Sequence, residues 1–190
     1  MKYILILACI SAILLFSVIA SGQKTFVSIG PDLALTGSSK QSNNNRGTGI
    51  GGSIRLESSW SKHISGIATV GYLSFAKRSP YPFSPTYTNQ VNVIPIQIGI
   101  KYYTQEKNLK PHGVFFSGEI GIMPTSTNIT FTNETKTNRK ENGFSTAFGA
   151  GYQYRRLESS FRLQYNLSDS GFDVYYYNFR IAYSLFKGKK

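Results

Sequence analysis

The stretch GGSIRLESSW (residues 51–60) places charged and apolar side chains on alternate positions. Arg55 and Glu57 are two residues apart, whereas Ile54, Leu56 and Trp60 fall on the other phase. In an extended strand, alternate side chains point to opposite faces, so the two charges share one face. Either the charges face water and the apolar side chains face a core, or the charges are enclosed and the apolar side chains face lipid.

The composition of the chain favours an all-β protein. Charged residues make up 16% of the 190 residues, and the chain contains 13 Tyr, 13 Phe and 18 Gly. Aromatic residues are enriched in strands, and strong helix formers are scarce after residue 35. The mean hydropathy of −0.19 is too low for a helical membrane bundle. It is compatible with membrane-spanning strands, in which only alternate residues need to be apolar.

The first 22 residues have the features of a cleaved signal peptide. Lys2 precedes an apolar run over residues 3–20, which ends in small residues. We therefore predict a signal peptide over residues 1–22 and a mature barrel domain over residues 23–190. A retained N-terminal helical anchor is the alternative.

Eight later stretches alternate with period two and predict strands. Each is about 10–13 residues long, close to the roughly 9–11 residues that a tilted membrane strand needs. Only the third stretch has an ambiguous phase. The eight stretches cover residues 25–36, 48–60, 64–76, 91–103, 113–123, 143–155, 157–167 and 174–186.

The connections between these strands alternate in length. The turns at 61–63 and 155–156 are short, whereas the segments 37–46, 77–89 and 124–142 are long and polar, and we expect them to be loops. Long and short connections at opposite ends of an even number of strands are typical of outer-membrane barrels. We predict an all-β fold, an eight-stranded antiparallel up-and-down transmembrane β-barrel, with both termini at the short-turn, periplasmic end.

The polar phase of the predicted strands carries four cations and four anions. A buried face needs such balance, because an unpaired buried charge is costly. The interior of an eight-stranded barrel is only wide enough for side chains to fill, so the large Ile, Leu, Phe and Tyr side chains of the other phase must point outward. A solvated face of a soluble sheet is the alternative. The ions predicted to form a network in the lumen are Asp32, Arg55, Glu57, Lys101, Glu119, Glu158, Arg162 and Arg180.

Aromatic residues on the apolar phase or near strand ends predict girdles at the two membrane interfaces. The residues assigned to these girdles are Trp60, Tyr102, Tyr103, Tyr152, Tyr154, Phe179 and Tyr183.

The segments VIPIQIGIKYYTQ (93–105) and PHGVFFSGEIGIMP (111–124) resemble the small outer-membrane β-barrel domain family of Gram-negative bacteria. NFRIAYSLF (178–186) resembles the last strand that the barrel-insertion machinery reads, although residues 187–190 follow it. The resemblance implies an eight-stranded barrel in the outer membrane and no single biochemical activity. The insertion signal that it implies consists of Phe179, Ile181, Tyr183, Leu185 and Phe186.

Residues suited to catalysis or cofactor binding do not gather in the sequence. His63 and His112 are expected in exposed turns, and Cys9 lies in the predicted signal peptide. Asp169 and Asp173 share the last loop, which is weak evidence for a cation site. We expect no enzymatic activity, no cofactor and no metal. The alternative is an outer-membrane lipid-modifying or proteolytic enzyme with His, Ser or Asp at the barrel rim.

The formal net charge of +12 lies outside the predicted lumen network. Anionic lipid headgroups, including lipopolysaccharide phosphates, are the partners we expect, because export to the envelope argues against nucleic acid. The predicted function is that of a monomeric outer-membrane barrel with a side-chain-filled lumen, a structural or surface-interaction platform and not a channel. A soluble secreted barrel that binds a small hydrophobic ligand is the remaining alternative.

Overall fold

The computed structural model describes residues 25–36, 47–79, 87–105, 112–131, 136–168 and 174–187. The predicted signal peptide (residues 1–22), the segment 37–46, Asp169 and Asp173 lie outside the described residues. Within these described ranges, no helix is long and apolar enough to cross a membrane.

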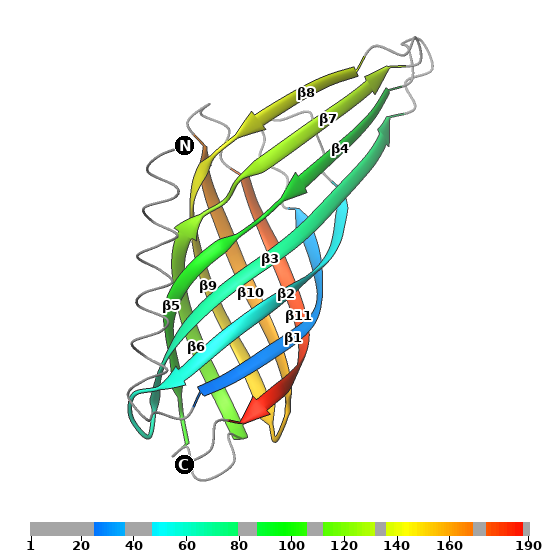
Figure 1. The fold of residues 1–190 in the computed structure, drawn as a ribbon. Helices are drawn as coiled ribbons and strands as arrows, with labels where there is room; N and C mark the ends of the chain where they lie inside the picture. The colour runs from blue at the N-terminus through cyan, green and yellow to red at the C-terminus, as the bar shows by residue number, and fades with distance from the viewer. Residues whose placement is uncertain are drawn as a thin grey trace.

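All strands belong to one antiparallel sheet. Eight of them, β1, β2, β3, β5, β6, β9, β10 and β11, close into a barrel, because β1 pairs with both β2 and β11 and β2 pairs with β3 (Figure 1). The prediction of an eight-stranded antiparallel barrel is confirmed. The strands are β1 (Thr25–Thr36), β2 (Thr48–Ser59), β3 (Ile64–Ser79), β4 (Tyr87–Val93), β5 (Ile96–Tyr103), β6 (His112–Ile122), β7 (Thr125–Phe131), β8 (Lys136–Glu141), β9 (Gly143–Tyr154), β10 (Leu157–Ser168) and β11 (Val174–Lys187).

Three of the barrel strands continue beyond the barrel after a short interruption. Ile94 and Pro95 separate β4 from β5, Met123 and Pro124 separate β6 from β7, and Asn142 separates β8 from β9. A proline lacks the N–H that a ladder hydrogen bond requires, which explains two of the interruptions.

The strand register is the same on both sides of these interruptions. Val93 pairs with Thr125 above the break, and Ile96 pairs with Ile122 below it. β3 has no interruption over its 16 residues and pairs with β5 in the barrel and with β4 beyond it. The upper part of β3 together with β4, β7 and β8 therefore forms one sheet that extends past the barrel, hereafter the projecting sheet (Figure 1).

The projecting sheet corrects the expectation that segments 77–89 and 124–142 are loops. They contain the end of β3, the start of β4, and all of β7 and β8. The sequence TSTNITF of β7 is polar on both phases except for Ile129 and Phe131, so it lacks the alternation of apolar and polar residues that indicates a strand. Pairing with neighbouring strands in an established register imposes the extended conformation there.

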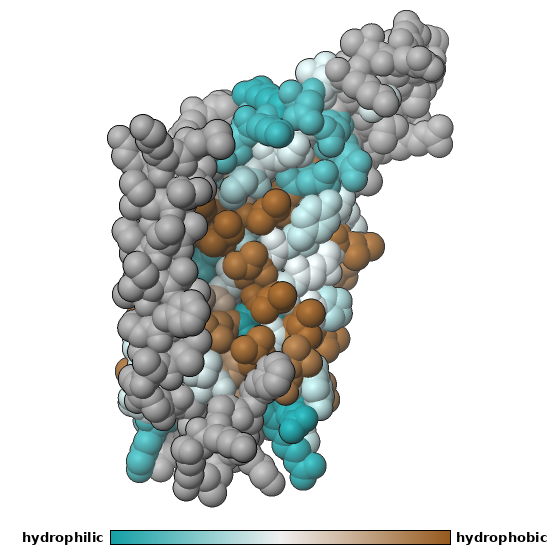
Figure 2. Space-filling view, in the orientation of Figure 1, coloured by the Kyte–Doolittle hydropathy of each residue, from teal (hydrophilic) through white to brown (hydrophobic). Residues whose placement is uncertain are grey.

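The outer face of the barrel carries the large apolar side chains. Ile98 is 55% exposed and Phe148 is 69% exposed. In the third predicted strand, whose phase was ambiguous, Val70 and Tyr72 face outward while Leu73 faces inward and is buried. Figure 2 shows this apolar surface across the middle of the molecule, with hydrophilic residues at both ends.

The turn between β9 and β10 consists of Arg155 and Arg156 alone, since Tyr154 pairs with Leu157. Arg155 has a φ of 56°, in the left-handed region. An L-residue with a Cβ atom pays about 1–2 kcal/mol for this conformation, whereas Gly does not.

Candidate functional site

The eight ionic residues predicted for the lumen all lie inside the barrel, and each is at most 5% exposed. Arg55 occupies the centre of the group. Its Nη1 donates to Glu158 Oε1 at 2.8 Å, its Nη2 donates to Glu119 Oε1 at 3.0 Å, and its Nε donates to Thr69 Oγ1 at 3.1 Å. One guanidinium therefore joins side chains from four strands of the wall.

From Glu158 the network continues to two further cations, Lys101 and Arg180. Lys101 Nζ lies 2.7 Å from Glu158 Oε2 and 3.0 Å from Glu57 Oε2. Arg180 Nη1 lies 3.0 Å from Glu158 Oε1, and its Nε donates to Ser53 Oγ at 2.8 Å. Glu158 is thus shared by three cations.

In the other direction, Arg162 links Glu119 to Asp32. Its Nη1 lies 3.4 Å from Glu119 Oε1 and its Nη2 lies 3.2 Å from Asp32 Oδ1. Gly149, on the adjacent strand, makes room for this side chain, because a Cβ there would lie 2.7 Å from Arg162 Cγ. The eight residues form one connected and formally neutral set, so removal of any member leaves a buried charge without full compensation.

The structure corrects the assignment of Tyr103 to an outer aromatic girdle. Its side chain is fully buried in the lumen, and its hydroxyl donates to Gln153 Oε1 at 2.6 Å and to Glu57 Oε1 at 2.9 Å. The Phe115 ring lies beside it, with its centroid 3.9 Å from Lys101 Nζ. Tyr103 follows Lys101 by two residues on the same strand, so the strand phase already indicated an inward side chain.

A layer of amide and hydroxyl groups lies beyond the ions. Gln97 Nε2 donates to Ser145 Oγ at 2.7 Å, and Gln164 Nε2 donates to the same oxygen at 3.1 Å. These short polar contacts lie between the network and the end of the lumen next to the projecting sheet, hereafter the outer end.

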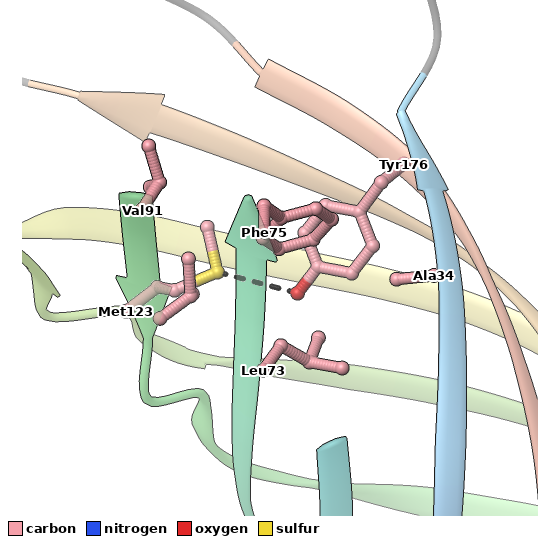
Figure 3. Close-up of a cluster of buried hydrophobic side chains, with 7 residues drawn as sticks. Ala34, Leu73, Phe75, Val91, Met123 and Tyr176 are labelled. Atoms are coloured by element: carbon pink, nitrogen blue, oxygen red, sulfur yellow. Dashed lines mark hydrogen bonds between the residues drawn. The ribbon is translucent and has the colours of Figure 1, made fainter. Parts of the chain in front are cut away.

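Apolar side chains close the outer end of the lumen (Figure 3). Tyr176 stacks edge-on against Phe75, with 5.8 Å between ring centroids, and its hydroxyl donates to Met123 Sδ at 3.4 Å. The members of this apolar plug are Ala34, Leu73, Phe75, Val91, Val93, Met123 and Tyr176. Val91 and Val93 belong to β4, so the plug joins the barrel to the projecting sheet.

No protein-family model and no curated protein matches the sequence. Solved structures do match the fold. Ail, the attachment invasion locus protein of Yersinia pestis, has a TM-score of 0.60 and 10% identity, over 85% of this chain and 97% of Ail. The N-terminal β-barrel domain of Pseudomonas aeruginosa OprF has a TM-score of 0.53 and 7% identity, over 84% of this chain and 97% of that domain.

The outer membrane protein OprG from Pseudomonas aeruginosa has a TM-score of 0.51 and 10% identity, over 86% of this chain and 96% of OprG. The chain has the fold of the small outer-membrane β-barrels. At these identities the likeness concerns the fold and carries no activity with it.

The outer surface of the projecting sheet is polar. Asn138 Nδ2 donates to Asn128 Oδ1 at 2.8 Å across β7 and β8. Gln90 Nε2 donates to Ser74 Oγ at 3.3 Å. Strand β8 pairs only with β7 and forms an edge of the sheet. Charged side chains on such an edge oppose pairing with other chains.

The two histidines lie on different elements of the structure. His63 lies in the β2–β3 turn, half-buried, with Nδ1 3.0 Å from the carbonyl oxygen of Tyr103. His112 is the first residue of β6, which corrects its expected place in an exposed turn. Within the described part of the chain, no group of three or more His, Cys, Asp or Glu residues could hold a metal ion.

The residues of the expected insertion signal lie on β11. Phe179, Ile181, Tyr183 and Leu185 alternate on the outer face and are 42–50% exposed. The side chain of Phe186 lies outside the described residues.

Proposed function

We propose that this protein is an integral outer-membrane barrel whose filled lumen makes it a rigid platform for the projecting sheet. The observation that supports this proposal is the combination of a filled lumen with a polar sheet that extends beyond the apolar outer surface of the barrel. The ion network and the apolar plug stabilise the barrel, and the sheet offers the surface for interaction.

The contents of the lumen argue against a channel. The side chain of Arg55 contacts residues of β3, β6 and β10, so it bridges the lumen at the level of the network. Leu73, Phe75 and Tyr176, each at most 3% exposed, fill the outer end. An ion would have to break several charge-assisted hydrogen bonds and displace packed apolar groups in order to pass.

The membrane placement is part of the proposal. We propose that both termini are periplasmic, because the short turns lie at that end and outer-membrane barrels have short periplasmic turns. We further propose that the barrel-insertion machinery recognises β11 and that the protein is a monomer. The alternatives of an envelope enzyme and of a soluble ligand-binding barrel have no supporting contact in the described structure.

For the projecting end we propose anionic partners, lipopolysaccharide phosphates in particular. Arg139 and Lys140 on β8 are exposed there, and the chain as a whole has a formal charge of +12. Ail of Yersinia pestis, which has this fold, has been crystallised with the heparin analogue sucrose octasulfate. The complex of a protein of this fold with a polyanion supports our proposal that this chain has a basic surface that attracts phosphate groups.

Cysteine labelling in intact cells tests the placement. The mature domain would contain no cysteine, so Asn138→Cys and Lys62→Cys each introduce one reactive thiol. A membrane-impermeant maleimide should label Asn138→Cys in intact cells and Lys62→Cys only after the outer membrane is permeabilised. The opposite pattern would overturn the orientation, and extraction of the protein without detergent would overturn the membrane location.

Conductance measurements test the platform against the channel. The purified barrel in planar bilayers should give no steady current, because the network and the plug fill the lumen. A reproducible steady current from the unmodified protein would overturn the platform assignment.

A further inference from the structure

The turn Arg155–Arg156 presents two cations, and the first of them, Arg155, has a backbone conformation that glycine would adopt more easily. Two-residue hairpin turns with a positive φ at the first position favour Gly there. Arg155 has a φ of 56°, and both arginine side chains are exposed, so neither fills a core. Strain retained at an exposed position points to a role for the side chain.

The guanidinium groups of these residues lie on outward-facing tyrosines. Arg155 Cζ is 5.2 Å from the ring centroid of Tyr154, and Arg156 Cζ is 6.0 Å from that of Tyr183. Arg156 Nη1 also donates to the Tyr183 hydroxyl at 3.2 Å. These contacts direct both cations along the outer wall of the barrel.

The apolar surface below the two arginines is continuous. Leu157 pairs with Tyr154 on β9 and with Tyr183 on β11, so the three side chains form one row across the outer face. Leu157 is 54% exposed at the centre of this row. One cation therefore lies on each side of an exposed leucine, at the edge of the apolar band.

Neither guanidinium forms an ion pair with a carboxylate of the described residues. Two forked donors on aromatic faces suit a phosphate group, which accepts hydrogen bonds from several directions. Lipid phosphates lie at the border between hydrocarbon and water, which is where the row places these donors.

We propose that Arg155 and Arg156, with Tyr154, Leu157 and Tyr183, form a binding site for an anionic glycerophospholipid. The two guanidiniums bind the phosphate, the tyrosines flank the glycerol region, and Leu157 contacts the first part of an acyl chain. The inference rests on the proposed membrane placement, with the short turns in the periplasmic leaflet.

Native mass spectrometry of the detergent-purified full chain tests the site with phosphatidylglycerol, phosphatidylcholine and lipid A as probes. The unmodified protein should retain phosphatidylglycerol in preference to the other two. The double variant Arg155→Gly/Arg156→Gln should lower that retention by about tenfold, since two charge-assisted hydrogen-bond donors are lost. Lys62→Gln, which removes one cation from the other turn at the same end, should leave retention unchanged.

A second readout separates a lipid site from a structural role. Arg155→Gly alone should raise the midpoint of urea unfolding in lipid-free micelles, because it relieves the left-handed conformation, and should still reduce phosphatidylglycerol retention. The proposal would be overturned if the double variant retained as much phosphatidylglycerol as the unmodified protein. It would also be overturned if Arg155→Gly were less stable than the unmodified protein. Preferential retention of lipid A would overturn the choice of lipid. These measurements need no cell orientation, so their failure is distinct from a failed labelling experiment.

Discussion

The barrel wall and the projecting sheet are made by the same strands in the same register, yet their outer faces differ. On β3, Val70 is 51% exposed in the barrel wall. Four residues further along the same phase is Ser74, which accepts a hydrogen bond from Gln90. Ile96 on β5 and Ile94, between β4 and β5, are exposed, whereas the next outward residue is Asn92 on β4.

This difference shows that hydrogen-bonded strand pairing and the polarity of the outer face are specified separately. Pairing continues from β6 to β7 across Pro124 without a change of register. The chemistry of the outward phase changes, from isoleucine and phenylalanine in β6 to serine, asparagine and threonine in β7. The outward-facing residues, which are every second residue of each strand, therefore determine where the apolar band ends.

The inner faces of the two regions differ as well. In the barrel the inward side chains include eight paired ions, whereas the side chains at the junction with the projecting sheet form the apolar plug. The ions need one another because water is excluded, and the plug provides that exclusion at the outer end.

The largest expected effect is that of Glu119→Ala in the barrel interior. The change leaves Arg55 with one carboxylate partner fewer and Arg162 with only Asp32, so we expect a loss of about 3–5 kcal/mol in the free energy of unfolding. Urea unfolding in phospholipid vesicles measures it.

Lys140→Ala on the exposed edge strand β8 serves as the control for this variant. It should change the free energy of unfolding by less than about 0.5 kcal/mol, because its side chain is exposed. Similar losses for both variants would mean that the interior network and the surface of the projecting sheet contribute alike, which contradicts the comparison.

The second-largest expected effect is the loss of stability caused by a charge at an outward-facing position of the barrel wall, compared with the same charge on the projecting sheet. Ile98→Arg puts a cation on the apolar band of β5 and should destabilise the barrel by about 2–4 kcal/mol in a bilayer. Gln90→Arg makes a related change on the outer face of the projecting sheet and should cost less than about 0.5 kcal/mol. Heat-modifiable gel mobility of vesicle-inserted protein compares the two, and an equally large loss for Gln90→Arg would place the projecting sheet in the bilayer.

The smallest of the three expected destabilising effects lies at the junction. Val91→Ala removes two buried methyl groups from the plug, so we expect a loss of about 1–2 kcal/mol. The barrel should still insert, because the ion network is intact. Failure of the variant to fold would show that the barrel depends on the plug as strongly as on the network.

Alternation in the sequence was sufficient to predict the barrel and the phase of every barrel strand except β3. A charge such as Arg55 between Ile54 and Leu56 specifies which face it shares, because side chains alternate strictly along a strand. The phase that carries small residues and a balanced set of ions was predicted to face the lumen. The lumen of an eight-stranded barrel has no room for the large Ile, Leu, Phe and Tyr side chains of the other phase.

Only the tertiary structure decided which groups meet. Alternation predicts the face on which a side chain lies, but not its position along the barrel axis or the side chain that it contacts. The contacts of Glu158 with Lys101, Arg55 and Arg180 therefore depend on the stagger between strands. For Tyr103, the strand phase gives the inward face, whereas the contacts of its hydroxyl with Glu57 and Gln153 depend on the tertiary structure. The strands β7 and β8 have weak signals of their own and exist because their neighbours extend a register already set in the barrel.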